Sequence, residues 1–467
     1  MRTDEAAADA AAPRHGRGHP AWLRTPADAN SLLTALWPAN VRRAPDGELE
    51  VAGVPVRRLA RRHGTPVFVV DEDDFRSRAR AFRDAFAGGT VFYAGKAFLC
   101  VAVARWVVEE GLSLDVCSGG ELAVAERAGV PPQRIAFHGN NKSVPELARA
   151  LELGVGRIVV DSSAEITRLA ALARDRGVVA PVLLRVTAGV EAHTHTHIAT
   201  AHEDQKFGFS ITAGDALAAA RVVAADPALR LLGLHSHIGS QIFDTAGFEL
   251  AARRVLGLHA QIAVDTGHIC SELGLGGGFG IAYTTRDDPQ APAHLAAELG
   301  AAVSSECKSL GIDVPQLSVE PGRAIAGPST CTLYEVGTVK RVPLGGGATR
   351  TYVGVDGGMS DNIRAALYAA DYSCTLASRR SQAAPVLARV VGKHCESGDV
   401  VVRDEYLPGD VTAGDLLAVP GTGAYCRSLA SNYNHVPRPG VVAVRAGRVR
   451  LLVRPETEDD LLRLDVE

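Results

Sequence analysis

Several titratable residues end or follow short apolar runs in this chain of 467 residues. Lys96 follows the run VFYAG, Asp115 lies in LSLDV, and Glu320 follows QLSV. A lysine amine in an apolar site has a lowered pKa and a free lone pair, which suits Schiff-base chemistry. A carboxylate beside a pyridine nitrogen keeps that nitrogen protonated, so that the ring accepts electrons. The residue types therefore indicate Schiff-base chemistry at the ends of the runs.

Glycines and a histidine extend this pattern. Gly276, Gly277 and Gly278 follow another apolar run, and such a turn can offer backbone N–H groups to a phosphate. His237 lies in HSHIG, where its ring can stack on a planar cofactor. Lysine, carboxylate, glycine turn and histidine together point to pyridoxal 5'-phosphate as the cofactor. The glycine run lacks the spacing of a dinucleotide-binding fingerprint.

Eight apolar runs alternate with helical stretches, and their composition is typical of parallel strands that are covered on both faces. Three S-x-x-E sequences, beginning at Ser118, Ser143 and Ser162, predict capping boxes at the starts of helices. Eight such units predict a (β/α)8 barrel over residues 72–330, with its chemistry at the carboxyl ends of the strands. The predicted strands are 91–95, 112–116, 134–139, 157–162, 181–186, 231–239, 271–277 and 316–322.

The pattern changes after about residue 330. Runs such as TLYEVGTVKRV and GVVAVRAG are separated by Gly, Pro and Asp, which predicts an antiparallel β-sandwich or β-barrel domain over 331–467. Residues 26–71 are predicted to join this β domain. Residues 1–25, rich in Ala, Arg, Gly and Asp, are predicted to be a disordered extension. The fold class is thus an α/β barrel followed by an all-β domain.

Composition excludes several other classes of protein. The net charge is −4 and 22% of the residues are charged, so neither nucleic acid nor a membrane surface is expected as a partner. The sequence has no apolar run long enough to span a bilayer and no secretory signal. None of the eight cysteines forms a CxxC pair. We therefore expect a reduced cytoplasmic protein.

The motifs resemble those of the alanine-racemase-fold, pyridoxal-phosphate-dependent amino-acid decarboxylases, and within them the diaminopimelate decarboxylases. The resemblance extends in order from about residue 30 to the C-terminus. In the barrel it is carried by Tyr93-Ala-Gly-Lys96-Ala, Asp115-Val-Cys-Ser-Gly-Gly-Glu121, His138-Gly-Asn-Asn-Lys142, His235-Ser-His237-Ile-Gly-Ser240-Gln241 and Glu320-Pro-Gly-Arg323. In the β domain it is carried by Asp356-Gly-Gly-Met-Ser-Asp-Asn362-Ile-Arg364, Tyr368, Cys395-Glu396-Ser397 and Gly423-Ala-Tyr425.

The resemblance implies a role for each cofactor-binding residue. Lys96 would hold the cofactor as a Schiff base, Glu320 would pair with the pyridine nitrogen, and His237 would stack on the ring. Asp115 would support the site near Lys96. The phosphate would be held by Ser240, Gly276, Gly277, Gly278, Tyr425 and the backbone of Pro321, Gly322 and Arg323.

The resemblance also implies the substrate and a partner. Arg323, Arg364, Tyr368 and Tyr425 would bind meso-diaminopimelate, with Glu396 on its distal ammonium group. Cys395 would return a proton to the α-carbon after CO2 leaves. Cys395 and Glu396 would come from the partner subunit of a head-to-tail homodimer. The implied reaction is decarboxylation of meso-diaminopimelate to L-lysine.

Three other functions are considered. A decarboxylase for lysine, ornithine or a carboxy-polyamine would not need an arginine clamp for a second carboxylate. An amino-acid racemase of the same barrel type would place an arginine, not Glu320, at the pyridine nitrogen. A catalytically silent homologue would lack Lys96 or Cys395. The alternating His193, His195 and His197 are interpreted as a loop rather than a metal site, because no acidic or Cys partner has suitable spacing.

Overall fold

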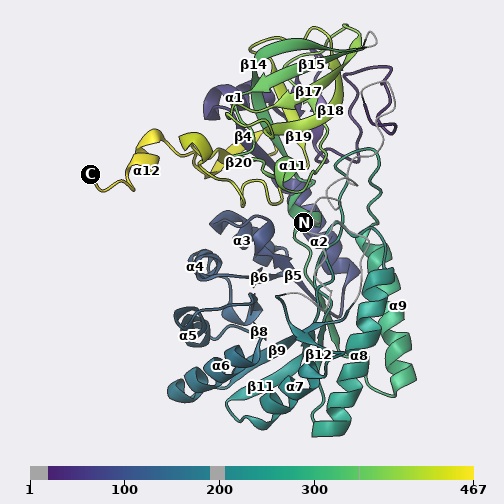
Figure 1. Ribbon diagram of the computed structural model, residues 1–467, viewed down its shortest axis with the longest axis vertical. Helices are drawn as coiled ribbons and strands as arrows, with labels where there is room; N and C mark the ends of the chain where they lie inside the picture. The colour runs from purple at the N-terminus through teal and green to yellow at the C-terminus, as the bar shows by residue number, and fades with distance from the viewer. Residues whose placement is uncertain (1–18, 190–205, 346–347) are drawn as a thin grey trace, which may run out of the picture. The chain divides into compact units, whose positions relative to one another are not determined.

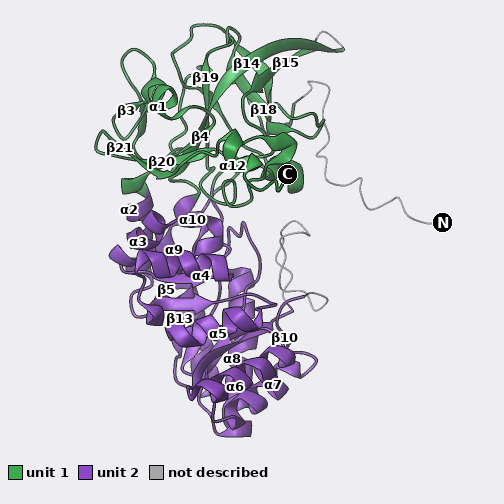
Figure 2. Cartoon of the chain, turned by 90° about the vertical axis from the view of Figure 1, so that its left-hand side faces the viewer, with its two compact units in different colours: residues 1–74, 282–288, 327–467 green, residues 75–281, 289–326 purple. Residues whose placement is uncertain are grey.

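A computed structural model describes residues 19–189, 206–345 and 348–467, which form two compact units (Figure 2). Unit 1 comprises residues 1–74, 282–288 and 327–467, and unit 2 comprises 75–281 and 289–326. Residues 1–18 of the predicted extension lie outside the described residues, as do His193, His195 and His197. Among the described residues, no helix has the length and apolar character needed to cross a membrane.

Eight parallel strands close into a barrel in unit 2 (Figure 1). Pairing of β8 with β9 and of β13 with β5 completes the ring. Each strand falls on one of the eight predicted apolar runs, so the predicted (β/α)8 barrel is confirmed. A short strand, β10 (Phe209–Ser210), pairs with β9 outside the ring. The barrel strands are β5 (Thr90–Ala94), β6 (Ser113–Val116), β7 (Ile135–Phe137), β8 (Arg157–Val160), β9 (Ala180–Thr187), β11 (Leu229–His235), β12 (Glu272–Gly274) and β13 (Gln316–Val319).

Helices surround the barrel strands (Figure 1). Two long ones, α8 and α9, pack against each other and connect the last three strands. Residues 95–97 and 132–134 form single 3-10 turns, η1 and η2. The helices are α2 (Glu72–Ala85), α3 (Val101–Glu109), α4 (Gly119–Ala128), α5 (Val144–Leu153), α6 (Ser163–Arg176), α7 (Asp215–Ala225), α8 (Ala246–Thr266), α9 (Pro292–Leu310) and α10 (Arg323–Ala326).

The three predicted N-caps are present, but only one is a full capping box. Ser118, Ser143 and Ser162 each accept a hydrogen bond from the backbone N–H three residues later. Glu146 returns a bond to Ser143. Glu121 and Glu165 instead accept from the residue before the cap. These two glutamates therefore tie each helix to the end of the preceding strand.

Unit 1 is a β domain that takes in the N-terminal segment, as predicted. Its largest sheet has the order β18-β17-β15-β14-β4-β20-β21. The sheet is mixed rather than purely antiparallel, because β15 pairs in parallel with β17, and β20 with β4. The strands and helices are β1 (Val41–Arg43), β2 (Leu49–Val51), β3 (Val54–Pro55), α1 (Val56–His63), β4 (Val67–Asp71), β14 (Thr330–Gly345), β15 (Ala348–Val355), α11 (Arg364–Leu367), β16 (Thr375–Leu376), β17 (Pro385–Val391), β18 (Val400–Pro408), β19 (Leu416–Pro420), β20 (Gly440–Arg445), β21 (Arg448–Val453) and α12 (Glu458–Leu462).

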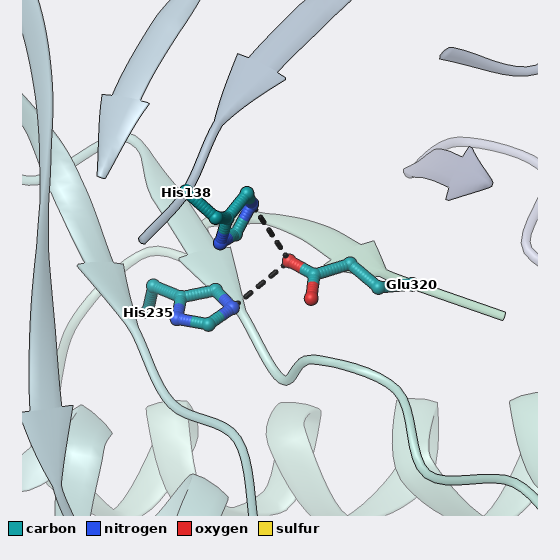
Figure 3. Close-up of side chains that lie close together, drawn as sticks. All are labelled: His138, His235 and Glu320. Carbon is teal, nitrogen blue, oxygen red and sulfur yellow. Dashed lines mark hydrogen bonds and ion pairs between the residues drawn. The ribbon is translucent and has the colours of Figure 1, made fainter. Parts of the chain in front are cut away.

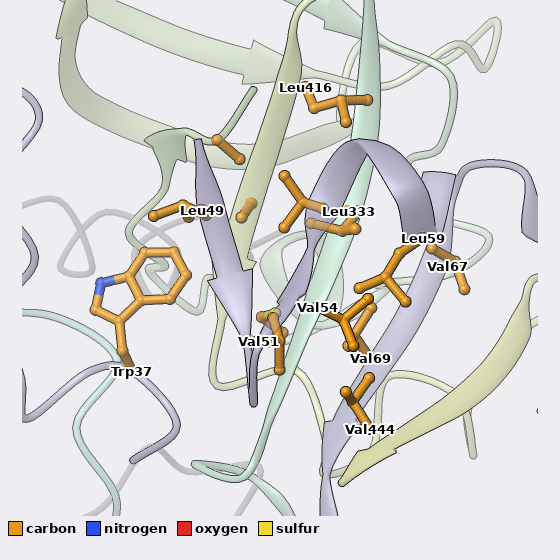
Figure 4. Packing of buried hydrophobic residues seen from close by; sticks show 14 of the residues in the cluster. Trp37, Leu49, Val51, Val54, Leu59, Val67, Val69, Leu333, Leu416 and Val444 are labelled. Atoms are coloured by element: carbon orange, nitrogen blue, oxygen red, sulfur yellow. The ribbon is translucent and has the colours of Figure 1, made fainter. Parts of the chain in front are cut away.

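A hydrophobic cluster joins the two ends of the chain in unit 1. Val67 and Val69 of β4 pack with Leu333 of β14, Leu416 of β19 and Val444 of β20 (Figure 4). All of these side chains are buried. The backbone of β4 pairs with both β14 and β20. The N-terminal segment is therefore part of the core of the β domain and not an appendage to it.

We expect Leu333→Ala to lower the free energy of unfolding by about 2–5 kcal/mol, because Leu333 is fully buried in this cluster and truncation leaves a cavity. Leu451→Ala is the control, because its side chain lies 47% exposed on β21. The midpoint of urea unfolding, followed by circular dichroism, measures both. Equal midpoints for the two variants would contradict the assignment of Leu333 to the core.

Candidate active site at the carboxyl ends of the barrel strands

Lys96 lies in the 3-10 turn η1, directly after β5. The ends of β5 and β13 approach closely, since Ala94 N–H donates to the Pro321 carbonyl oxygen over 3.3 Å. A Cβ on Gly322 would lie 2.9 Å from the Cβ of Ala94. The expectation that Lys96 is buried is wrong, because its side chain is exposed.

Glu320 is held between two histidines from other strands (Figure 3). Its Oε1 lies 2.9 Å from Nε2 of His235, at the end of β11, and 3.4 Å from Nε2 of His138, which follows β7. The two imidazole rings meet edge to face with centroids 4.9 Å apart. All three side chains are buried. Both contacts use Oε1, so Oε2 is the oxygen that remains for a further partner.

Two buried carboxyl groups of the site have opposite charge states. Burial, and then the negative charge of Glu320, raise the pKa of Asp115 well above its usual value. Burial would also raise the pKa of Glu320, but His235 and His138 hold it well below its usual value. The negative charge therefore resides on Glu320. This is the charge that a protonated pyridine nitrogen requires.

The glycine turn packs against the ends of neighbouring strands. A Cβ on Gly276 would lie 2.7 Å from Nδ1 of His237, and one on Gly277 would lie 2.2 Å from the Glu320 carbonyl oxygen. Gly278 has a φ of +108°. Each position therefore requires glycine. The same turn orients His237, because Gly277 N–H donates to its Nδ1 over 3.1 Å.

His237 is consequently a neutral ring with a fixed tautomer. Nδ1 accepts a hydrogen bond, so the single proton of the imidazole is on Nε2. Burial, together with the charge of Lys96, lowers the pKa of His237 well below its usual value. A flat, uncharged ring is suited to stacking on a planar cofactor.

Ser240 and Arg323 lie together. The guanidinium of Arg323, buried at the start of α10, donates to Oγ of Ser240 over 2.7 Å. A hydroxyl and a guanidinium in contact form a donor pair for a phosphate or carboxylate. The structure thus brings together Lys96, Asp115, His237, Ser240, Glu320, Arg323 and the glycines within unit 2.

Arg364 belongs to unit 1 and is held by two tyrosines. Its guanidinium carbon lies 4.8 Å from the ring centroid of Tyr283, and its Nη1 donates to the Tyr372 hydroxyl over 2.8 Å. Tyr368 ends the same short helix, α11, and is half-buried. The arginine is therefore presented in one orientation, which suits recognition of a carboxylate.

Cys395 and Glu396 lie in the loop between β17 and β18 of unit 1, and both side chains are exposed. Asp399 fixes the base of this loop by accepting hydrogen bonds from His394 N–H and Met359 N–H over 2.8 and 2.6 Å. Tyr425, also in unit 1, is half-buried and has a φ of +68°. The relation of these residues to Lys96 stays a prediction.

The two histidines around Glu320, together with Glu320 itself, also have the types and spacing of metal ligands. The ligand atoms of His138, His235 and Glu320 lie within 4.8 Å of one another. Metal binding through Nε2 of His235 would move its proton to Nδ1, which has no hydrogen-bond partner among the described residues. The arrangement therefore favours a hydrogen bond between imidazole and carboxylate. That no metal is needed stays a prediction.

The side chains and the glycine turn of the site fit pyridoxal 5'-phosphate. The site combines an exposed lysine, a buried ionised carboxylate, a neutral histidine ring and a glycine turn in which Cβ atoms would clash. Sequence reasoning gave no role to His138, His235, Tyr283 or Tyr372. The two histidines are visible in the sequence as strand-end residues, but only the fold shows that they share Glu320.

Comparisons with known proteins agree with this chemistry. Residues 72–327 match the family described as "Pyridoxal-dependent decarboxylase, pyridoxal binding domain". The diaminopimelate decarboxylase of Mycobacterium tuberculosis is 60% identical over 440 residues, covering 93% of this chain and 98% of that protein. That of Bacillus subtilis is 47% identical over 429 residues, covering 91% and 97%. The crystal structure of diaminopimelate decarboxylase from M. jannaschii with L-lysine has a TM-score of 0.85 at 30% identity, covering 92% of this chain and 98% of that chain.

We expect Gly277→Ala to weaken the affinity for pyridoxal 5'-phosphate by about tenfold or more, because a forced backbone shift costs about 1–3 kcal/mol. The added Cβ would lie 2.2 Å from the Glu320 carbonyl oxygen. Titration of the apoprotein with the cofactor, followed by absorbance, measures this affinity. Gly300→Ala in α9 is the control, since its Cβ would meet nothing within 4 Å. Wild-type affinity in Gly277→Ala would refute the close-packing argument.

Proposed function

The chain belongs to the pyridoxal-dependent diaminopimelate decarboxylases, and on that premise we propose that it converts meso-diaminopimelate to L-lysine and CO2 as the last step of lysine biosynthesis. The observation that carries this proposal is the juxtaposition of an ionised, buried Glu320 with the strand ends that hold Lys96 and the glycine turn. When bound, pyridoxal 5'-phosphate supplies an electron sink for the pair left on the α-carbon.

Different residues of the barrel would bind different parts of the cofactor. Lys96 would supply the amine that holds the cofactor. Glu320 would keep the pyridine nitrogen protonated, and His237, with its proton on Nε2, would stack on the ring. The phosphate would be held by Ser240, the three glycines, the backbone from Pro321 to Arg323 and Tyr425. Asp115, kept protonated by burial and by Glu320, supports the site without adding a second charge.

Selection of the substrate rests on its second amino-acid centre. Arg364, oriented by Tyr372, binds the distal carboxylate together with Arg323 and Tyr368. Glu396 pairs with the distal ammonium group. Lysine and ornithine present only an amine at this end, which an arginine repels. Arg364 is therefore the residue that favours diaminopimelate over these amino acids.

We also propose a head-to-tail homodimer in which Cys395 and Glu396 act in the site of the partner subunit. Their exposure on a loop with a fixed base supports this assignment, because such a loop tip is available to a second chain. In this proposal Cys395 would donate the proton that the α-carbon takes up after CO2 leaves. The proposed location is the cytoplasm.

Release of CO2 from meso-diaminopimelate, L-lysine and L-ornithine tests the proposed reaction. We expect the holoenzyme to release CO2 from diaminopimelate alone and to form L-lysine, because the arginine clamp requires a second carboxylate. Lys96→Ala is the control and is expected to lose turnover. Faster turnover of lysine or ornithine would overturn the roles of Arg323, Arg364 and Glu396 but not the cofactor site.

Mixing of inactive variants tests the shared site. Glu396→Gln and Lys96→Ala homodimers are each expected to be inactive, because each lacks one half of every site. After random exchange of equal amounts, half of the dimers are mixed and each carries one site with both groups intact, so about a quarter of wild-type activity is expected to return. Lys96→Ala mixed with Lys96→Met is the control and recovers nothing. Absence of recovery in the first mixture, with exchange verified by mass spectrometry, contradicts a site shared between subunits.

A further inference from the structure

The hydrogen bond between His235 and Glu320 joins the ends of β11 and β13, the two strands that flank β12. His235 is the last residue of β11, and Glu320 follows the last residue of β13. The bond length is 2.9 Å, and His235 is 1% exposed. A buried hydrogen bond to an ionised group stabilises that charge more strongly than a bond between neutral groups. His235 is therefore placed to act on the charge of Glu320 and not only to fill space.

The surroundings of His235 determine which nitrogen carries its proton. Nδ1 is buried, and among the described residues no hydrogen-bond partner reaches it. A tautomer with its only proton on Nδ1 would leave that buried donor without an acceptor and would leave Nε2 unable to donate. A proton on Nε2 is instead donated to Oε1 of Glu320. His235 is therefore a fixed donor to Oε1.

His138 closes the other side of the same oxygen. Its Nε2 lies 3.4 Å from Oε1 of Glu320 and 3.7 Å from Oδ1 of Asp115. Burial lowers the pKa of His138 well below its usual value, so this ring is neutral. The two rings enclose Oε1, while Oε2 is left for another partner (Figure 3). The carboxylate is thus fixed in orientation as well as in charge.

We propose that His235 is a positioning residue, which fixes the Glu320 carboxylate in its ionised form and turns Oε2 toward the pyridine nitrogen of the cofactor, with His138 as its second support. This inference rests on the role given to Glu320 above and extends it to residues that do not touch the cofactor. It predicts that the protonation of the pyridine nitrogen depends on a side chain at the end of β11.

The test measures the pyridine nitrogen directly. Holoenzyme is reconstituted with pyridoxal 5'-phosphate labelled with 15N in the ring, and the 15N chemical shift is recorded for each variant. His235→Leu removes the donor, whereas His235→Gln keeps an N–H donor at nearly the position of Nε2. We expect the Leu variant to move the shift toward the unprotonated value and the Gln variant to restore much of it.

Two solution measurements accompany the spectrum. Loss of one charge-assisted hydrogen bond is expected to lower kcat by about 10- to 100-fold in His235→Leu, with a smaller change in KM. The affinity for the cofactor is expected to fall by a similar factor, because Glu320 loses its fixed orientation. His259→Leu is the matched control: it removes another buried histidine, on α8, and is expected to leave the 15N shift unchanged.

Further variants separate this inference from the function on which it rests. If Glu320→Gln leaves the 15N shift unchanged, the assignment of Glu320 to the pyridine nitrogen is wrong. If Glu320→Gln moves the shift but His235→Leu does not, only the role of His235 fails. Should His235→Leu not fold, His235→Asn replaces it, because the shorter amide cannot reach Oε1. An unmoved shift in that variant would equally overturn the proposal.

Discussion

The buried negative charge of Glu320 is the interaction on which the rest of the site depends. An ionised carboxylate in an apolar barrel is unstable unless donors surround it. His235 and His138 reach the same oxygen from β11 and from the end of β7, and Asp115 remains protonated beside them. The sheet order places these strand ends around one interior, since the ring of eight strands is closed. The closed barrel therefore brings together the groups that stabilise the charge of Glu320.

Close approach of backbones is the second constraint. Gly322 lets the end of β13 contact the end of β5, and Gly277 lets the turn after β12 contact the backbone of Glu320. These contacts connect the strand end that carries Lys96 with the one that carries the carboxylate. The same turn sets the tautomer of His237 through Gly277 N–H. Glycine at these positions allows the strand ends to lie in close contact, which fixes their relative positions. Gly277 and Gly322 are therefore required for packing as well as for their predicted role in phosphate binding.

Most of the barrel and much of the site could be predicted from the sequence. Parallel strands covered on both faces are nearly continuous apolar runs, so all eight were visible, and their polar ends marked the site. Pairing between distant segments was not visible: the parallel neighbours β15 with β17 and β4 with β20 depend on tertiary topology. For the same reason the sequence could not show that His138 and His235 share one oxygen, or that Tyr283 and Tyr372 hold Arg364. The exposure of Lys96 likewise depends on the fold around it.

The central claim is that this barrel binds its cofactor through Lys96. Reduction of the holoenzyme with borohydride, followed by proteolysis and mass spectrometry, tests it most directly, because reduction makes the link between cofactor and lysine permanent. We predict that the pyridoxyl label is found on the peptide that contains Lys96. A label on another lysine, such as Lys142 or Lys206, would contradict it.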